Sequence, residues 1–326
     1  MKTILVTGAT GCIGSNLTIQ LLQQGYQVRA FHRPNSNMLT LKDVNVRHCI
    51  GDVRDRDSLR EAMRGCDTVF HTAAIVSFWN KKRAEQFQVN VDGTRNVIEL
   101  CLEMGVEKLI HTSSVAALGY RTDGKLIDES TAYNWGRNIG YKYSKHLAEL
   151  EILKGVEKGL NATMVNPTVI IGPRDAYVHG GQIVRDVKRG LVPAYVAGGT
   201  NIVSVHDVVA GHIAAENLGR PGKRYILGGS NLTHKEVFAL AAAVLNGRAP
   251  FFKAPIWTVK SIAKLFDFIG DVTNIQPWIT SELISGVGTC QWYSIEKAQQ
   301  ELGYRPAPIE DAMREAHEWY VENGIM

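Results

Sequence analysis

The stretch TGATGCIG, residues 7–14, decides the fold, because it follows a short apolar run and opens a helical pattern. Gly8 permits a tight turn, Gly11 lets the backbone approach a ligand closely, and Gly14 lets the helix pack against the strand. A strand, a glycine-rich turn and a helix in this order form a dinucleotide-binding turn, in which a pyrophosphate lies at the helix N-terminus. The alternative is a plain tight turn, which the position between a strand and a helix disfavours.

Strand and helix patterns alternate along the first half of the chain. Apolar, strand-like runs occupy residues 2–7, 27–32, 44–50, 68–72, 108–113 and 161–171, and helical patterns occupy residues 13–24, 56–64, 82–104 and 140–158. Continuous apolar runs are typical of strands that are buried on both faces. We therefore predict an α/β fold with a Rossmann-type, doubly wound parallel sheet.

The alternation stops after Gly172. Residues 173–201 are glycine-rich, basic and loop-like, Thr233 and Glu236 form a capping box for a helix, and residues 250–326 carry three or four helical patterns. We expect a smaller, mostly helical and discontinuous second domain. The predicted dinucleotide-binding domain spans residues 1–172 plus about 206–228, and the predicted substrate-binding domain spans about 173–205 and 229–326.

Composition limits the possible partners. The chain has 326 residues, of which 45% are hydrophobic, and its net charge of +4 is too small to indicate nucleic acid as a partner. The five cysteines are scattered without metal-ligand spacing, so we expect reduced thiols and no metal site. The sequence shows no secretory signal and no apolar run of membrane-spanning length, which predicts a cytoplasmic protein that acts on a small-molecule substrate.

The end of the second strand predicts which dinucleotide binds. An acidic residue at this place bonds the ribose of NAD, whereas an arginine accommodates the additional phosphate of NADP. Here the strand ends in Arg33, with Ser36 just beyond and no Asp or Glu. The residues therefore favour NADP(H) over NAD(H); the alternative is that Arg33 is a solvated loop charge.

Two further strand ends carry small or polar residues that suit a bound dinucleotide. Asp52 and Val53 end the third strand, where Asp52 could accept from an adenine amino group or act as a helix N-terminal acid. His71 to Ala74 end the fourth, and the small side chains of this segment permit a cofactor to lie against the backbone. We interpret His71 as a core histidine rather than a catalyst.

Ser114, Tyr141 and Lys145 are the candidate catalytic residues. Ser114 follows the fifth strand, and Tyr141 and Lys145 are four residues apart on one face of the next helix. A carbonyl that receives hydride needs a proton donor. A neighbouring ammonium and a bound, positively charged nicotinamide both favour the phenolate, so we expect a lowered Tyr141 pKa. Tyr293 and Lys297 have the same spacing, but no serine-rich strand end precedes them, and we interpret them as a chance match.

Motifs along nearly the whole chain resemble the extended short-chain dehydrogenase/reductase family. They are TGATGCIG at 7–14, GDV at 51–53, HTAA at 71–74, NVDGT at 90–94, TSS at 112–114, YKYSK at 141–145, NPTVIIGP at 166–173 and SVHDVVAG at 204–211. The chain looks like the dihydroflavonol 4-reductase and 3β-hydroxysteroid dehydrogenase branch, close to bacterial members labelled hopanoid-associated sugar epimerases. The resemblance implies that Ser114, Tyr141 and Lys145 are catalytic and that Arg33 selects NADP.

The resemblance also implies further contacts around the cofactor. It places Asn166, Pro167 and Thr168 beside the nicotinamide and makes Asn90 a structural polar residue under the site. Together the motifs and the resemblance give the candidate cofactor-binding residues Gly8, Thr10, Gly11, Cys12, Ile13, Gly14, Arg33, Ser36, Asp52, Val53, Thr72, Ala73, Ala74, Tyr141, Lys145, Asn166, Pro167 and Thr168.

Departures from the family pattern bear on the substrate. Nucleotide-sugar members usually carry an Arg-Asp-Phe run just before residue 204 and an aromatic residue where this chain has Ile171. Trp79, Tyr133 and Trp135 are instead candidate substrate-pocket residues, with ordinary packing as the alternative. We predict an NADP(H)-dependent oxidoreductase that interconverts a carbonyl and a secondary alcohol on a small organic or lipid-like substrate. The alternatives are a nucleotide-sugar epimerase or dehydratase and an NADP-sensing binding protein.

Residues 250–270 alternate apolar side chains with Lys253, Lys260 and Lys264. Base rates for amphipathic helices favour a lid helix that packs its apolar face on the substrate domain. The alternative, which the pattern over residues 254–270 leaves open, is contact with an anionic membrane surface. Likewise, the helical patterns at 82–104 and 140–158 permit a homodimer, although sheet packing also explains their apolar positions.

Overall fold

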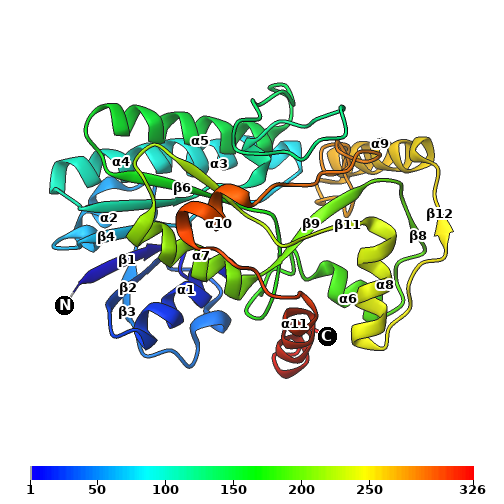
Figure 1. Cartoon of the computed structure of the whole chain (residues 1–326), viewed down its shortest axis with the longest axis horizontal. Coiled ribbons are helices and arrows are strands. Elements are labelled where there is room, and N and C mark those ends of the chain that lie inside the picture. The colour runs from blue at the N-terminus through cyan, green and yellow to red at the C-terminus, as the bar shows by residue number, and fades with distance from the viewer. Residues whose placement is uncertain (1) are drawn as a thin grey trace.

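A parallel sheet of seven strands runs through the computed structural model, which describes residues 2–326 (Figure 1). Its strands are β1 (Thr3–Thr7), β2 (Gln27–His32), β3 (Arg47–Ile50), β4 (Thr68–His71), β5 (Lys108–Thr112), β6 (Ala162–Pro167) and β10 (Arg224–Leu227). They lie in the order β10-β6-β5-β4-β1-β2-β3, and every neighbouring pair is parallel. The predicted doubly wound sheet is therefore confirmed.

Helices cover both faces of this sheet (Figure 1). One layer contains α1 (Cys12–Gln23), α7 (Val205–Leu218) and α10 (Glu296–Leu302), and the other contains α2 (Arg56–Met63), α4 (Gly93–Met104) and α5 (Gly140–Glu157). Because side chains alternate along a strand, Ile4 and Val6 of β1 pack toward α1 and α7, whereas Leu5 packs toward α2 and α4. Burial on both faces explains why these strands are apolar throughout.

The glycine-rich turn lies where the strand order reverses, between β1 and β4. Gly8 has φ +67°, and a Cβ there would lie 2.7 Å from the backbone nitrogen and Cα of Ala73. A Cβ on Gly14 would lie 2.3 Å from the carbonyl oxygen of Gly8. The turn can therefore pack against β4 and α1 only with glycine at these two positions.

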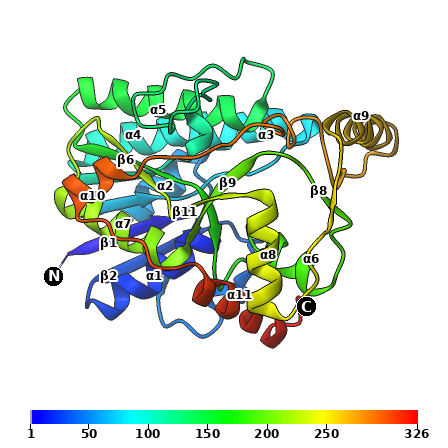
Figure 2. The ribbon, with the colours of Figure 1, turned by 45° about the vertical axis from the view of Figure 1, so that its right-hand side comes forward.

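The remaining residues build a second region beside the carboxyl edge of the sheet (Figure 2). It has a three-stranded sheet of β7 (Val169–Ile171), β9 (Gly199–Ser204) and β11 (Ser230–Thr233) and a pair formed by β8 (Ala194–Tyr195) and β12 (Phe252–Lys253). Its longer helices are α8 (His234–Leu245), α9 (Ile256–Thr273) and α11 (Glu310–Glu322). α6 (Gln182–Lys188), α8 and α11 share one apolar core.

Three boundaries differ from the prediction. The apolar run 161–171 divides at Thr168 into β6 and β7, which belong to different sheets. The predicted helix 82–104 comprises a 3₁₀ turn (Asn80–Lys82), α3 (Arg83–Phe87), a π-helical turn (Gln88–Asp92) and α4. The segment 173–201 is not all loop, since it contains α6, β8 and the start of β9.

The prediction for the helix in 250–270 holds for only one of its apolar sides. Of the side chains of α9, only Ala263 and Gly270 are buried, and most of its large apolar side chains are exposed. One apolar side of α9, with the half-buried Ile256, Val259 and Phe266, packs on the protein, whereas a second apolar side is exposed. No helix formed by residues 2–326 is both long and apolar enough to cross a bilayer.

The packing of the turn predicts the effect of adding one methyl group. Gly14→Ala should lower the free energy of unfolding by about 1–3 kcal/mol, because its Cβ overlaps backbone atoms that cannot move independently. The matched control is Gly11→Ser, whose Cβ would meet only the Gly8 carbonyl oxygen at 3.3 Å and whose hydroxyl can cap the helix. Urea unfolding without cofactor measures both variants, and equal stability of the two would contradict this account of the turn.

Candidate active site

The candidate site lies at the carboxyl ends of β1, β4, β5 and β6. In the turn after β1, Gly11 is the N-cap of α1 and supplies no side-chain cap, so the N–H groups of the first helical turn face outward. A Cβ on Gly11 would meet only one atom, the Gly8 carbonyl oxygen. This open side of the turn fits the pyrophosphate of a dinucleotide, which needs free N–H donors and close backbone approach.

Other predicted residues of this turn support its shape. The carbonyl oxygen of Thr10 accepts from the Thr40 hydroxyl at 3.1 Å, and the carbonyl oxygen of Thr40 in turn accepts from the Arg174 guanidinium. Cys12 is half-buried, and burial raises the pKa of its thiol. Ile13 packs against the core on the α1 side of the sheet.

Arg33 follows β2 and is exposed, and among residues 2–326 it has no ion-pair partner. Ser36 lies on the same loop and donates its N–H to the Arg33 carbonyl oxygen at 3.1 Å.

Asp52, just after β3, is paired with Arg54 through contacts of 3.0 and 2.7 Å. The hydrogen bonds from Arg54 lower the Asp52 pKa, and the more distant Arg33 charge adds a smaller effect in the same direction. Val53 is buried against Gly93.

The end of β4 brings small residues against the turn. Thr72 donates its hydroxyl to the Thr7 carbonyl oxygen at 2.7 Å, and the N–H of Ala73 donates to the Thr7 hydroxyl at 3.3 Å. Ala74 continues this segment and is half-buried. His71 is buried between the hydroxyls of Thr7 and Thr94, at 2.8 and 3.0 Å, and burial lowers its pKa to about 3. His71 is thus a neutral core histidine, as predicted.

Ser114 and Tyr141 meet at the end of β5. Ser114 follows β5 and its hydroxyl accepts from the Ala116 N–H at 3.1 Å, while Tyr141 lies in the first turn of α5. Tyr141 is 9% exposed, and the Ser114 hydroxyl lies near enough to its phenol to lower the Tyr141 pKa. The two hydroxyls that the sequence predicted to act together are therefore adjacent.

In the protein without ligand the Tyr141 pKa is not lowered; the predicted lowering also relies on the bound nicotinamide and stays a prediction. Burial raises the pKa of the phenol, and the hydrogen bond from Ser114 offsets only part of this effect. The Lys145 ammonium does not reverse it, because it donates to the Thr112 carbonyl oxygen at 3.0 Å. Tyr141 therefore keeps its proton across the neutral pH range.

Lys145 is buried beside a carboxylate that the sequence analysis missed. Burial lowers the Lys145 pKa to about 8, and the nearby Glu149 carboxylate opposes this effect. Glu149 is 3% exposed and accepts from the Ser113 hydroxyl and the Asn166 amide, each at 2.6 Å, and from Arg224 at 2.8 Å. Glu149 is four residues after Lys145, so the spacing that linked Tyr141 to Lys145 could also have identified it.

Asn166, Pro167 and Thr168 lie at the end of β6. The Asn166 amide also donates to the Ser114 carbonyl oxygen at 2.9 Å, and so joins Glu149 to the loop after β5. Pro167 pairs with Leu227 of β10. Thr168 donates its hydroxyl to Asn201 at 2.8 Å, at the point where the chain leaves the large sheet.

Asn90 connects helix α5 to the loop after β4. It lies in the π-helical turn, and its amide exchanges hydrogen bonds with the N–H and carbonyl of Ile75 at 2.8 and 3.0 Å. It also donates to Ser144 at 3.0 Å. Asn90 thus fixes the first turns of α5 relative to the loop that follows β4.

The three predicted substrate-pocket aromatics lie around the N-terminus of α5. Tyr133 stacks on His146 with ring centroids 4.5 Å apart, and Trp135 donates to the Leu118 carbonyl oxygen at 3.0 Å. The Lys142 ammonium lies 3.0 Å from the centre of the Trp135 ring, and burial lowers its pKa to about 7. Trp79 is half-buried, but its neighbour Phe78 contacts Tyr141, with ring centroids 5.5 Å apart.

A cavity of about 490 Å³ opens beside Phe78. It is lined by Phe78, Asn80, Arg83, Asn138, Ile139, Asp267, Ser281, Glu282 and Ser285. Glu282 accepts from the backbone N–H of Tyr141 at 2.8 Å and so caps the start of α5. Sequence reasoning missed Glu282 because it lies 141 residues away from its partner, and no local pattern marks it.

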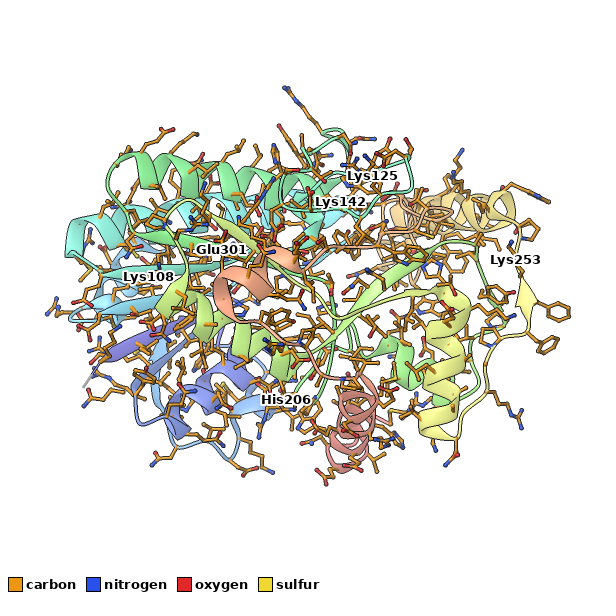
Figure 3. All side chains as sticks on the ribbon, in the orientation of Figure 1. Lys108, Lys125, Lys142, His206, Lys253 and Glu301 are labelled. Atoms are coloured by element: carbon orange, nitrogen blue, oxygen red, sulfur yellow. The ribbon has the colours of Figure 1, made fainter. Side chains whose placement is uncertain are left out.

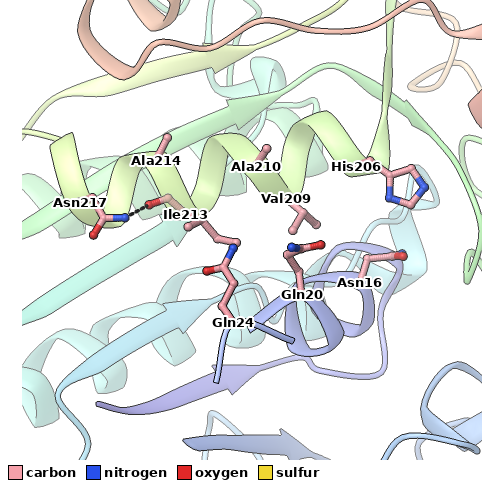
Figure 4. Close-up of a pocket in the computed structure, with 9 residues that line it drawn as sticks. All are labelled: Asn16, Gln20, Gln24, His206, Val209, Ala210, Ile213, Ala214 and Asn217. Atoms are coloured by element: carbon pink, nitrogen blue, oxygen red, sulfur yellow. Dashed lines mark hydrogen bonds between the residues drawn. The ribbon is translucent and has the colours of Figure 1, made fainter. Parts of the chain in front are cut away.

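A second Tyr/Lys pair and a groove lie outside the candidate site described above. Tyr293 is buried in a cluster with Leu118, Ile127 and Ile226, and Lys297 donates to the Arg224 carbonyl oxygen at 2.9 Å. That this pair is a chance match stays a prediction. A groove of about 370 Å³ lies between α1 and α7, where Figure 4 shows Gln20 and Gln24 opposite Val209 and Ile213. It contains none of the predicted site residues.

The contact between Glu149 and Lys145 predicts a pH effect. Glu149→Gln removes the negative charge that favours the ammonium, so the Lys145 pKa should fall further below about 8. Lys145 would then lose its proton at a lower pH than in the wild type. NMR titration of the Lys145 side chain checks this, with Glu151→Gln on the same helix as the control. Glu151 pairs with Arg95 at 3.0 Å instead, so an equal shift in both variants would contradict the assignment.

Comparison with known proteins identifies the family. The pattern of the NAD dependent epimerase/dehydratase family matches residues 4–228. A Synechocystis protein named "Putative dihydroflavonol 4-reductase" is 36% identical over 98% of this chain and 95% of its own length. Sterol demethylase protein B of Methylococcus capsulatus is 32% identical over 99% and 100% of the two chains. The human sterol-4-alpha-carboxylate 3-dehydrogenase, decarboxylating, is 33% identical over 96% and 86%.

Solved structures agree with this placement. The crystal structure of gox2253 superimposes with a TM-score of 0.86 and 37% identity over the whole of both chains. UDP-glucose 4-epimerase of Thermotoga maritima shares the fold, with a TM-score of 0.80 and 20% identity over 98% of this chain and 99% of its own. The predicted family and enzyme class are confirmed: the chain belongs to the NAD dependent epimerase/dehydratase family, a group of NAD(P)-dependent extended short-chain dehydrogenases/reductases.

Proposed function

We propose that this protein is an NADP(H)-dependent oxidoreductase that interconverts a carbonyl and a secondary alcohol on a small organic or lipid-like substrate. The observation that carries the proposal is the pairing of the Ser114 and Tyr141 hydroxyls at the end of β5, with the buried Lys145 one helical turn away. The substrate would lie between the carboxyl edge of the large sheet and the second region, formed by about residues 173–205 and 229–326.

The residues of the chain act on the oxygen of the substrate. The nicotinamide, when bound, supplies or accepts the hydride at the carbonyl carbon. Ser114 and Tyr141 hold the substrate oxygen between their hydroxyls, and Tyr141 gives its proton to that oxygen as negative charge develops on it. Lys145, whose charged form Glu149 favours, stabilises the phenolate that remains and would bond the nicotinamide ribose.

The protonation states of Tyr141 and Lys145 in the protein without ligand favour carbonyl reduction over alcohol oxidation. Burial keeps Tyr141 protonated, and a proton donor is what carbonyl reduction requires at its start. Lys145, with a pKa of about 8, is mostly charged at neutral pH. The Tyr141 proton and the Lys145 charge are thus both in place before substrate arrives.

The proposal of a lipid-like substrate without a diphosphate rests on the names of two relatives and on the residues of β9. Two of the similar proteins are named for sterols, which are large, mostly apolar secondary alcohols. In β9, where nucleotide-sugar members would carry the Arg-Asp-Phe run, Asn201 is buried and donates its amide to Asn231 at 2.8 Å. This place therefore offers no free cation for a diphosphate, which favours a substrate without one.

Removal of a single oxygen atom tests the assignment of the proton donor. Tyr141→Phe should leave dinucleotide affinity nearly unchanged and lower kcat by about 10²–10⁴-fold, because the substrate oxygen loses its proton source. Tyr293→Phe is the control and should keep the wild-type rate. A panel of ketones assayed by NADPH absorbance gives the rates. An active Tyr141→Phe enzyme, or an inactive Tyr293→Phe enzyme, would show that the site is misplaced.

The choice of dinucleotide depends on Arg33 in this proposal. Its exposed guanidinium can form two charge-assisted hydrogen bonds to the 2′-phosphate of NADP, and Arg54 neutralises the adjacent Asp52. Two such contacts correspond to a preference for NADPH over NADH of about tenfold to a hundredfold. Arg33→Asp should reverse the preference, because a carboxylate repels the phosphate and accepts from the ribose hydroxyl of NAD.

The measurement is kcat/KM with each dinucleotide at one ionic strength. Lys42→Asp makes the same charge change at another exposed position on this side of the molecule and should leave the ratio of the two values unchanged. If the wild type uses both dinucleotides equally, or if both variants change the ratio alike, the role of Arg33 is refuted.

A further inference from the structure

Helix α9 presents an apolar face to solvent. We define the α9 face as Trp257, Ile262, Leu265, Phe268, Ile269 and Val272, whose exposed fractions range from 44% to 71%. A helix repeats every 3.6 residues, so these six side chains fall within one arc of roughly 140°. The opposite side of α9 holds its buried residues, Ala263 and Gly270. The α9 face is therefore a continuous apolar stripe that the described chain does not cover.

Aromatic and apolar side chains on either side of the helix in the sequence extend this exposed surface. Phe251 and Phe252, just before α9, are 80% and 63% exposed, and Ile275 and Trp278, just after it, are 70% and 63% exposed. β12 and α9 lie at the same end of the molecule in Figures 1 and 2. Contiguous exposed apolar surface of this kind marks an interaction site.

The charges around the α9 face indicate what it binds. Lys253, Lys260 and Lys264 are exposed, and Figure 3 shows Lys253 at the edge of this end of the molecule. Of the three acids in residues 251–283, Asp267 accepts from the Ser281 N–H at 3.0 Å and Glu282 accepts from the Tyr141 N–H, so both are held by the protein. Only Asp271 is an exposed acid in that segment. The outer charge of the segment is therefore positive.

We propose that the α9 face docks on the surface of an anionic phospholipid bilayer. An amphipathic helix with aromatic and aliphatic side chains on one face and lysines beside them lies in the plane of the bilayer interface, with its apolar face below the headgroups. Lys260 and Lys264, which border the apolar arc, then contact lipid phosphates. A second copy of the chain fits less well, because a self-complementary contact would offer the same lysines without a matching acidic patch.

The position of α9 links this docking to the candidate active site. Asp267, on the side of α9 away from its exposed arc, lines the cavity beside Phe78 together with Ser281 and Glu282. Docking would hold that cavity close to the bilayer, from which an apolar substrate could enter without crossing water. This link to the substrate rests on the proposed function, whereas the docking itself does not.

Vesicle binding by the full chain tests the docking without substrate or cofactor. The probe is vesicles of phosphatidylcholine with about one third phosphatidylglycerol, compared with pure phosphatidylcholine. We expect the wild type to co-sediment with the anionic vesicles and to release as salt is raised. Phe268→Glu should lower the partition coefficient by about tenfold to a hundredfold, since it removes one large apolar contact. The matched control is Val321→Glu on α11, also an exposed apolar position at 53%, which should bind like wild type.

A second variant separates the charge from the apolar contact. Lys260→Glu combined with Lys264→Glu should abolish the preference for phosphatidylglycerol and leave weak binding to both kinds of vesicle. The proposal is overturned if the wild type does not bind anionic vesicles, or if Phe268→Glu binds as well as Val321→Glu. It is also overturned if light scattering shows a wild-type dimer that Phe268→Glu converts to a monomer without any change in vesicle binding.

Activity on a water-soluble ketone distinguishes failure of the docking from failure of the proposed function. Phe268→Glu should keep the wild-type rate on such a substrate, because the exposed ring touches none of the reacting groups. Loss of vesicle binding with this rate intact supports the docking. An enzyme that reduces no carbonyl but still binds vesicles refutes only the proposed chemistry.

Discussion

The close approach of Gly8 to Ala73 is the constraint on which the rest of this structure depends. These two backbones meet where the strand order reverses, so the turn after β1 and the segment after β4 form opposite sides of one crevice. The hydroxyl of Thr7 bonds both His71 and the N–H of Ala73, which fixes the two strand ends relative to each other. The glycine-rich turn and the loop that leads to Phe78 are therefore positioned by the same contact.

Buried charge organises the other half of the site. Glu149 joins the helix that carries Tyr141 and Lys145 to Ser113 after β5 and to Asn166 in β6. An unpaired carboxylate in such a place would be costly, and here three donors satisfy it. The same carboxylate keeps the Lys145 ammonium charged in a site whose burial disfavours charge. One side chain thus serves the geometry and the electrostatics together.

The parts that local patterns determine were predictable from the sequence, and the parts that depend on distant contacts were not. The glycine spacing of residues 7–14 and the apolar runs predicted the sheet, because each reflects a local steric or burial requirement. The break at Thr168 was missed, since an apolar run does not show that its hydroxyl will bond Asn201 and send the chain into another sheet. Amphipathicity of residues 250–270 was visible, but which face the protein covers depends on contacts far along the chain. The raised Tyr141 pKa of the protein without ligand could not be predicted, because the sequence does not show how deeply the phenol is buried.

The hydrogen bond from the Tyr141 N–H to Glu282 has a consequence for how the site opens. Glu282 belongs to the segment that follows α9, and Lys142 in the same first turn of α5 donates to Ser285 at 3.1 Å. A movement of residues 280–285 away from the sheet would leave the first turn of α5 without these partners. Any such movement would change the cavity and the first turn of α5 together, so a molecule that fills the cavity would also stabilise that turn.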